Sequence, residues 1–363
     1  MFGKLFRKFF PVPDFLMMPS VGLDISETSI KFVELKPFKL GFRLSRFGSI
    51  STPEGSFSAG KIVDAGKMKE ALIKLKKDYN LDYVKVTIPE EQIYLFELNL
   101  PLVSLSEIKS SIELQLEEHI PISGSETVFD FSIISKNESG YKVQVAATSK
   151  SIVDGYMNLL ESASLKPLSF KLGAQAIANS VIKKGDNITC MIVDFGNVHT
   201  CISIVSAGYT LFTSTIDFGG QDLTKIIAKG LNLSLQESED KKKQFGLSKP
   251  EGNESEKDPF PILLNALAVL RDEISKNYLY WHTHKDEKGF PRVEIEKIIM
   301  CGGNSNLRGL SEYLSSTMKV KIELANVWIN VNSFDNYIPE INFNSSLGFA
   351  SAVGMALSDI SYD

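Results

Sequence analysis

Two acidic residues of this sequence stand where they could do chemistry, each at the end of a predicted strand and just before a turn. Asp24 lies in Val21–Leu35, and Asp194 lies in Met191–Ser206, where the same order of apolar run, acid, small-residue corner and alternating strand recurs. A carboxylate in this position can hold a hydrated cation while the N–H groups of the turn face a phosphate. Either stretch alone is more often a plain hairpin, but two that face each other would suit the phosphates and Mg²⁺ of a nucleotide.

A third pattern lies farther along the chain. Lys297–Leu310 reads as a buried strand, then Gly302 and Gly303, then the start of a helix. In this order the three patterns resemble the two phosphate motifs and the adenosine motif of the actin-like ATPase superfamily. The resemblance implies an α/β protein whose two halves enclose a cleft for ATP and Mg²⁺. The implied nucleotide contacts, with Asp24 and Asp194 binding Mg²⁺ through water, are Asp24, Ser26, Thr28, Ser29, Lys31, Asp194, Gly196, Asn197, Thr200, Gly219, Gly220, Glu273, Lys276, Gly302, Gly303 and Asn304.

Two of these contacts belong to a predicted helix at Ile262–Tyr280. Its segment around Glu273 and Lys276 resembles the helix that holds the ribose and adenine in the superfamily. The alternative is a surface ion pair, because residues three apart are neighbours on one helix face. An ion pair of that kind is worth only a few tenths of a kcal/mol.

Hydrolysis of a bound nucleotide needs a side chain that orients water. In the superfamily a Glu or Gln does this at the start of the helix that links the halves, which we expect at Phe170–Lys183. One register places Gly173 at the orienting position, and a register shifted by two offers Gln175. The resemblance therefore predicts ATP binding with slow or undetectable hydrolysis.

Composition narrows the class of protein. The chain has 363 residues, a formal net charge of −5 and 43% hydrophobic residues, which indicates a globular protein with a large core. Nucleic acid is not expected as the main partner, because phosphate binding needs a concentrated basic face. The three cysteines lack metal-ligand spacing and read as buried thiols in a reducing cytoplasm. No apolar run approaches the ~20 residues of a membrane-spanning helix, and no cleavable signal peptide is evident.

A small α+β insert is predicted inside the first half, from strands at Ile93–Leu100, Thr127–Ser135 and Tyr141–Ser149 and helices at Ser104–Ile120 and Ile152–Ser162. Its position and the run E-x-H-I-P-I at Glu117–Ile122 resemble the PilM family of type IV pilus assembly more than the FtsA family of cell division. The resemblance implies a cytoplasmic scaffold, peripheral to the inner membrane. Its implied partner is the N-terminal peptide of a PilN-type membrane protein, bound in a groove between insert and first half.

The helix at Ser104–Ile120 offers candidates for that groove. Its apolar stripe of Ile108, Ile112, Leu116 and Ile120 would face the sheet of the insert. Leu105 and Leu114 fall off the stripe, so they would contact either the first half or a bound peptide.

The predicted division of the chain is residues 1–19 as an amphipathic tail, 20–92 and 169–187 as the first half, 93–168 as the insert, 188–219 and 292–363 as the second half, and 220–291 as its helical subdomain. The tail would lie on an anionic membrane or dock its phenylalanines on protein.

The sequence leaves open whether the chain forms homo-oligomers. Two other functions stay open as well. An FtsA-like division tether would need a C-terminal amphipathic helix, for which Ser358–Asp363 leaves no room, and a small-molecule kinase would need a catalytic acid at the cleft.

Overall fold

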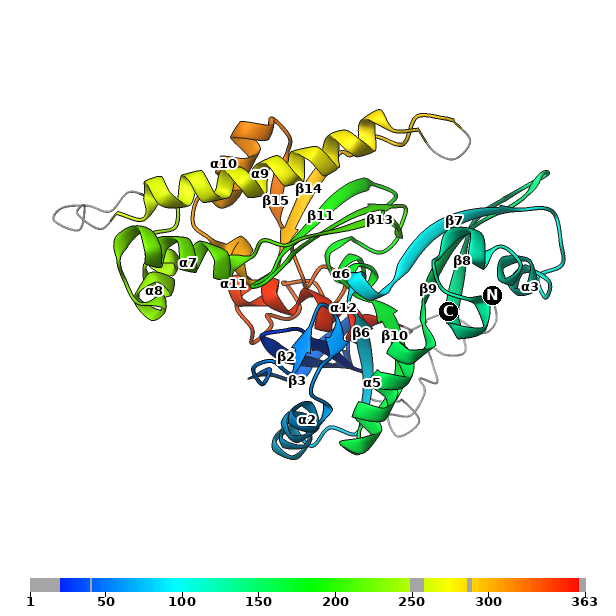
Figure 1. Cartoon of the computed structure of the whole chain (residues 1–363), viewed down its shortest axis with the longest axis horizontal. Coiled ribbons are helices and arrows are strands. Elements are labelled where there is room, and N and C mark those ends of the chain that lie inside the picture. The colour runs from blue at the N-terminus through cyan, green and yellow to red at the C-terminus, as the bar shows by residue number, and fades with distance from the viewer. Residues whose placement is uncertain (1–19, 40, 249–257, 286–288, 359–363) are drawn as a thin grey trace.

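The structure, a computed structural model, describes residues 20–39, 41–248, 258–285 and 289–358. The predicted tail at 1–19 lies outside these residues. Two α/β bodies, each built on a five-stranded sheet, stand one above the other in Figure 1, and a smaller body projects to one side. Within the described residues, no helix combines the length and apolar character needed to cross a bilayer.

The first sheet has the strand order β10-β6-β1-β2-β3. Its strands are β1 (Ser20–Ile25), β2 (Ser29–Phe38), β3 (Gly41–Ser51), β6 (Tyr83–Ile88) and β10 (Lys166–Leu172). β1 and β2 form the predicted antiparallel hairpin, in which Asp24 lies opposite Lys31. Helices α2 (Ala65–Tyr79) and α5 (Lys150–Ser162) cover the sheet, and α2 buries Met68, Leu72 and Leu75 at helical spacing.

The second sheet has the order β13-β12-β11-β14-β15. Its strands are β11 (Thr189–Phe195), β12 (Thr200–Ser206), β13 (Tyr209–Ile216), β14 (Lys297–Cys301) and β15 (Ile322–Leu324). β11 and β12 form the second predicted hairpin, and β14 pairs with β11 in parallel. The helices packed on this half are α7 (Gly220–Leu231), α8 (Leu235–Phe245), α9 (Phe260–Thr283) and α10 (Leu310–Met318).

The insert is a three-stranded antiparallel sheet, β7-β9-β8, made of β7 (Tyr94–Leu100), β8 (Thr127–Asn137) and β9 (Gly140–Ser149). Two hydrogen bonds join it to β13 of the second half. The Tyr209 hydroxyl donates to Ile133 O at 3.1 Å, and the Gln144 amide donates to Thr210 O. The insert therefore touches both halves, since its chain ends lead into the first.

The prediction of a single helix at Ser104–Ile120 is wrong. The segment forms two short helices, α3 (Ile108–Glu113) and α4 (Leu116–His119), and Ser104 bonds to Glu107 ahead of them. Apolar residues four apart drift by about 40° per step around a straight helix. A break at Gln115, whose N–H bonds to Ile112 O, lets all four stripe residues reach one sheet, and all four are buried.

The helix that links the halves begins later than predicted. Residues Phe170–Leu172 pair with β6 as the end of β10, and α6 spans Gly173–Val181. The closing helix α12 (Ala350–Leu357), preceded by α11 (Phe343–Ser346), packs between α6 and β1. One buried apolar cluster draws residues from α6, α12 and both sheets, so these two helices form the core between the halves.

Glycines allow this packing. A Cβ on Gly354 of α12 would lie 1.6 Å from Ala176 O of α6, and one on Gly22 of β1 would lie 2.0 Å from Ala352 O. Both distances are far inside van der Waals contact with rigid backbone. Helix and strand are therefore in direct backbone contact at the point where the halves meet.

We predict that Gly354→Ala lowers the free energy of unfolding by about 1–3 kcal/mol or more, because the methyl group forces α12 away from α6. Urea denaturation measures the change. Gly66→Ala in α2 is the matched control, since its Cβ meets only Asp64 Oδ1 at 3.3 Å, and it should be neutral or stabilising by up to about 1 kcal/mol. Equal stability of the two variants would contradict the packing.

Candidate functional site

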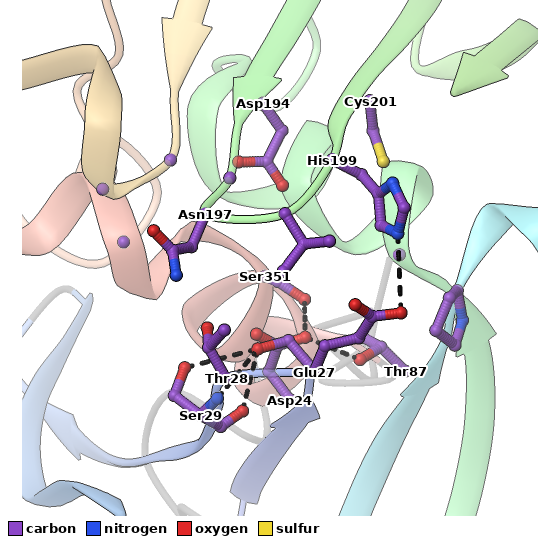
Figure 2. A pocket seen from close by; sticks show the side chains of 18 of the residues that line it. Asp24, Glu27, Thr28, Ser29, Thr87, Asp194, Asn197, His199, Cys201 and Ser351 are labelled. Carbon is purple, nitrogen blue, oxygen red and sulfur yellow. Dashed lines mark hydrogen bonds and ion pairs between the residues drawn. The ribbon is translucent and has the colours of Figure 1, made fainter. Parts of the chain in front are cut away.

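A cavity of about 210 Å³ lies between the two sheets, at the tips of both hairpins. Figure 2 shows Asp24, Thr28 and Ser29 on one wall and Asp194, Asn197 and His199 on the other. The closing helix supplies a third wall through Ser351. The two hairpins therefore face each other across one space, as their repeated pattern predicted.

Asp24 is held at the end of β1 by two hydroxyl groups. Thr87 Oγ1 of β6 donates to its Oδ1 at 3.0 Å, and Ser351 Oγ of α12 donates to the same oxygen at 2.9 Å. Figure 2 shows both bonds converging on this carboxylate. Asp24 is thus fixed by an adjacent strand and by the closing helix, which leaves its orientation little freedom.

Asp194 is electrostatically strained by comparison. Its pKa is raised to about 6, first by burial and then by the charge of Asp24, whereas Lys31 acts in the opposite direction. Two carboxylates that share one cavity favour a proton or a cation between them. The donor set of carboxylate oxygens suits the hard cation Mg²⁺, held through its own water molecules.

The glycines after β14 make space beside this acid. Gly302 has φ +87°, and a Cβ there would lie 2.4 Å from Asp194 Oδ1; around a Cβ on Gly303 nothing lies within 4 Å. A side chain at position 302 would collide with the carboxylate, whereas position 303 borders open space. The two carboxylates, the turns and this glycine-lined opening together fit a nucleotide phosphate with its Mg²⁺.

The tips of the hairpins also touch across the cavity mouth. His199 Nε2 lies 3.5 Å from Glu27 Oε1 of the opposite hairpin, as the dashed line in Figure 2 shows, and His199 Nδ1 lies 3.3 Å from Asp217 Oδ1. Glu27 also accepts the N–H of Ala59 at 2.6 Å. The imidazole therefore bridges the two halves.

The structure brings most of the predicted contacts to the cavity. Those that line it are Asp24, Ser26, Thr28, Ser29, Lys31, Asp194, Gly196, Asn197, Gly302, Gly303 and Asn304. Thr200 does not line the cavity; its hydroxyl donates instead to Phe218 O at 2.6 Å. Gly219 and Gly220 lie behind the lining, where a Cβ would meet Asn197 O at 2.4 Å or Asn304 Oδ1 at 2.0 Å.

Three other candidates are not brought to the cavity. Lys276 Nζ lies 3.5 Å from Glu273 Oε2 on the outer face of α9, with the lysine side chain 75% exposed. This geometry matches the surface ion pair considered as the alternative. Gln175 is partly buried in α6 and does not line the cavity, whereas Gly173 does.

The sequence reasoning missed Lys242. The run Lys241–Lys243 reads as a solvated helix end, yet Lys242 is only 2% exposed. Its ammonium donates to Gly220 O at 2.7 Å and to Asn304 Oδ1 at 3.3 Å, and it pairs with Glu239 at 2.8 Å. Burial lowers the pKa of Lys242 although Glu239 favours its charged form. The only feature of the sequence that could have indicated a buried Lys242 is its spacing of three residues from Glu239 on α8.

Glu90 was missed as well. It begins the short 3-10 helix η2 (Glu90–Gln92) after β6 and lines the cavity beside Gly173. Its pKa is raised to about 8, mainly by burial and also by the charges of Glu91 and Asp194, whereas hydrogen bonds to the backbone of Glu90 and Ala174 act in the opposite direction. Nothing in the local sequence distinguishes it from Glu91, which is exposed.

The sequence matches the family described as "Type IV pilus assembly protein PilM" over residues 22–360. Among solved structures, a PilM–PilN type IV pilus biogenesis complex is similar with a TM-score of 0.75 at 22% identity, over 93% of this chain and 97% of that one. MreB5 of Spiroplasma citri bound to ADP is similar with a TM-score of 0.57 at 12% identity, over 94% and 96%. These similarities confirm the predicted actin-like fold.

Similarity to curated relatives is partial. The cell division protein FtsA of Bacillus subtilis is 29% identical over 116 residues, which is 31% of this chain and 26% of that protein. FtsA of Staphylococcus epidermidis is 21% identical over 212 residues, or 53% and 44%. The chain thus spans between about a quarter and less than half of the length of these relatives.

The raised pKa of Glu90 predicts a pH-dependent stability. In the unfolded chain Glu90 loses its proton near its ordinary pKa, whereas the folded protein keeps the proton up to about pH 8. The free energy of unfolding should therefore fall as pH rises from about 5 to 8, by up to roughly 4 kcal/mol from this group. Asp194 adds to the fall in the lower part of that range.

Thermal unfolding of the nucleotide-free protein across this pH range measures the effect. Glu90→Gln should flatten the slope and raise the melting temperature at pH 8, whereas Glu70→Gln, an exposed glutamate on α2, should leave both unchanged. Parallel curves for wild type and Glu90→Gln would show that Glu90 ionises normally.

Proposed function

Because the chain belongs to the PilM family of type IV pilus assembly proteins, we propose that it is an ATP-binding scaffold in the inner-membrane part of a type IV pilus machine. In this role it binds Mg·ATP in the cavity and captures the cytoplasmic N-terminal peptide of a PilN-type membrane protein. The observation that carries the nucleotide proposal is the pair of facing acids, Asp24 and Asp194, in one cavity. Peripheral association with the inner membrane follows from the peptide partner.

The chain's own residues divide the work of holding a nucleotide. Asp24 and Asp194 bind the hydrated Mg²⁺, and Lys31 offsets the charge of the phosphates. The opening at Gly302 and Gly303 admits the phosphate and sugar. Bound Mg·ATP would supply a transferable γ-phosphoryl group, and no other chemistry is required of it for a scaffold.

Lys242 marks the side of the site where we expect the base and the ribose to bind. Its position behind Asn304 and Gly220 places a buried cation and the Glu239 carboxylate next to the glycine turn. We assign ribose recognition to the Glu239 carboxylate, which is 28% exposed and is held by the buried Lys242, in place of Glu273 and Lys276. A carboxylate suits the two hydroxyl groups of a ribose, since it accepts two hydrogen bonds.

Peptide capture is supported by the surface of the insert. Leu114 is 85% exposed and Leu105 is 67% exposed, although both stand beside a buried stripe. β7 and β8 are the two edges of the insert sheet. An extended peptide laid along such an edge gains main-chain hydrogen bonds, and exposed leucines give its apolar side chains contacts. The similarity to a PilM–PilN complex supports a partner of the PilN type.

We predict that Asp194→Ala weakens Mg·ATP binding by about 1–3 kcal/mol, the cost of losing a partner to a charged group. Isothermal calorimetry with Mg·ATP measures it, and Asp78→Ala, an exposed acid on α2, is the control. Absence of binding by the wild type, or equal binding by Asp194→Ala, would reject the nucleotide site.

We also predict that Leu114→Glu abolishes capture of the N-terminal peptide of the PilN-type protein while the melting temperature stays within a few degrees. The side chain is exposed, so the substitution costs little stability. Fluorescence anisotropy with the labelled peptide reads out binding. Leu279→Glu on α9, where the leucine is 59% exposed, is the matched control and should bind normally. Unchanged binding by Leu114→Glu would place the groove elsewhere.

A further inference from the structure

Glu90 occupies the space that a side chain at position 173 would need. A Cβ built on Gly173 would lie 2.9 Å from Glu90 Oε1 and 3.4 Å from its Oε2. Gly173 is the first residue of α6, and its backbone is in the ordinary helical region rather than one reserved for glycine. The absence of a side chain there is what lets the Glu90 carboxylate point into the cavity.

Glu90 lines the same cavity as Cys201 of β12, which belongs to the opposite half of the molecule. Its charge contributes to the raised pKa of the thiols of Cys201 and of Cys301 on β14. Its Oε1 is buried, and no hydrogen-bond partner for it exists among the residues that the structure describes. A buried carboxylate oxygen without a hydrogen-bond partner destabilises the fold unless a molecule in the cavity supplies a donor.

We propose that Glu90 positions the attacking water for hydrolysis of the nucleoside triphosphate, in the place of a side chain on the linking helix. This inference rests on the proposed binding of Mg·ATP. The unpaired Oε1 accepts a hydrogen bond from a water molecule in the cavity. The water oxygen forms a bond to the γ-phosphorus as the bond from that phosphorus to the bridging oxygen breaks. The departing diphosphate keeps the electron pair, and the water proton passes to Glu90, which must first be ionised. The rate should therefore rise with pH up to about 8.

This assignment changes the expectation drawn from Gly173. A missing side chain at that position predicts slow or undetectable hydrolysis only if no other group reaches the same space. Glu90 reaches it from the first half, by way of η2, and Gln175 does not line the cavity. Hydrolysis at a measurable rate is therefore expected, and it should depend on Glu90.

The first experiment separates turnover from binding. Phosphate release with saturating Mg·ATP measures kcat, and calorimetry measures the dissociation constant. Glu90→Gln should lower kcat by about 10²-fold or more, in the range for a positioned proton acceptor, while the affinity for Mg·ATP changes by less than about threefold. Glu70→Gln on α2 should match the wild type in both. If the wild type binds no Mg·ATP, the proposed function fails and this inference with it.

Two results would overturn the inference alone. One is a wild type that binds Mg·ATP and shows no turnover, and the other is a Glu90→Gln variant that turns over at the wild-type rate.

The second experiment tests whether the two positions share one space, first by thermal unfolding without nucleotide and then by turnover of Mg·ATP. Gly173→Gln should lower the melting temperature because its side chain meets Glu90, and Glu90→Ala/Gly173→Gln should recover most of that loss. The same double variant should regain part of the turnover that Glu90→Ala loses, because the glutamine then stands where Glu90 stood. Additive changes in melting temperature, or a double variant as inactive as Glu90→Ala, would show that the two positions do not substitute for each other.

Discussion

Two carboxylates of like charge stand on opposite walls of one cavity, and much of the architecture serves to keep them there. The hairpins place Asp24 and Asp194 at strand ends, and hydroxyl groups from β6 and α12 fix the first of them. Helix α12 stays close to β1 and α6 because Gly22 and Gly354 allow backbone contact. The repulsion is thus built into the folded state, and a cation that neutralises it stabilises the arrangement in which both halves are closed on the site.

The parts of the fold that could be predicted from the sequence are those set by local pattern. Alternating apolar residues on both sides of Asp24 and Asp194 specify hairpins, and glycines after β14 mark a close approach of backbone to ligand space. The similarity to known structures confirms the actin-like fold that these patterns predicted. The stripe of Ile108 and Ile112 was likewise readable, because burial on one face leaves a helical period.

The parts that could not be predicted depend on contacts between distant segments. Lys242 is buried only because α8 packs its face on the glycine turn before α7, and a run of three lysines gives no sign of this. Glu90 points inward because position 173, more than eighty residues away, lacks a side chain. The helix over Ser104–Ile120 breaks because the sheet beneath it demands one face, a requirement that periodicity alone does not contain. In each case tertiary packing overrides the local propensity.

The hydrogen bonds between β13 and the insert connect the two halves a second time, through the insert. The insert is continuous with the first half through the chain and is pinned to the second half by Tyr209 and Gln144. A body fixed to two supports cannot follow both when the angle between them changes. Rotation of the halves would therefore bend the connections between the insert and the first half, shear the β7-β9-β8 sheet, or break these two hydrogen bonds. The angle between the halves and the shape of the insert surface are therefore coupled. A ligand that changes one of them changes the other, and the coupling free energy is the same in both directions.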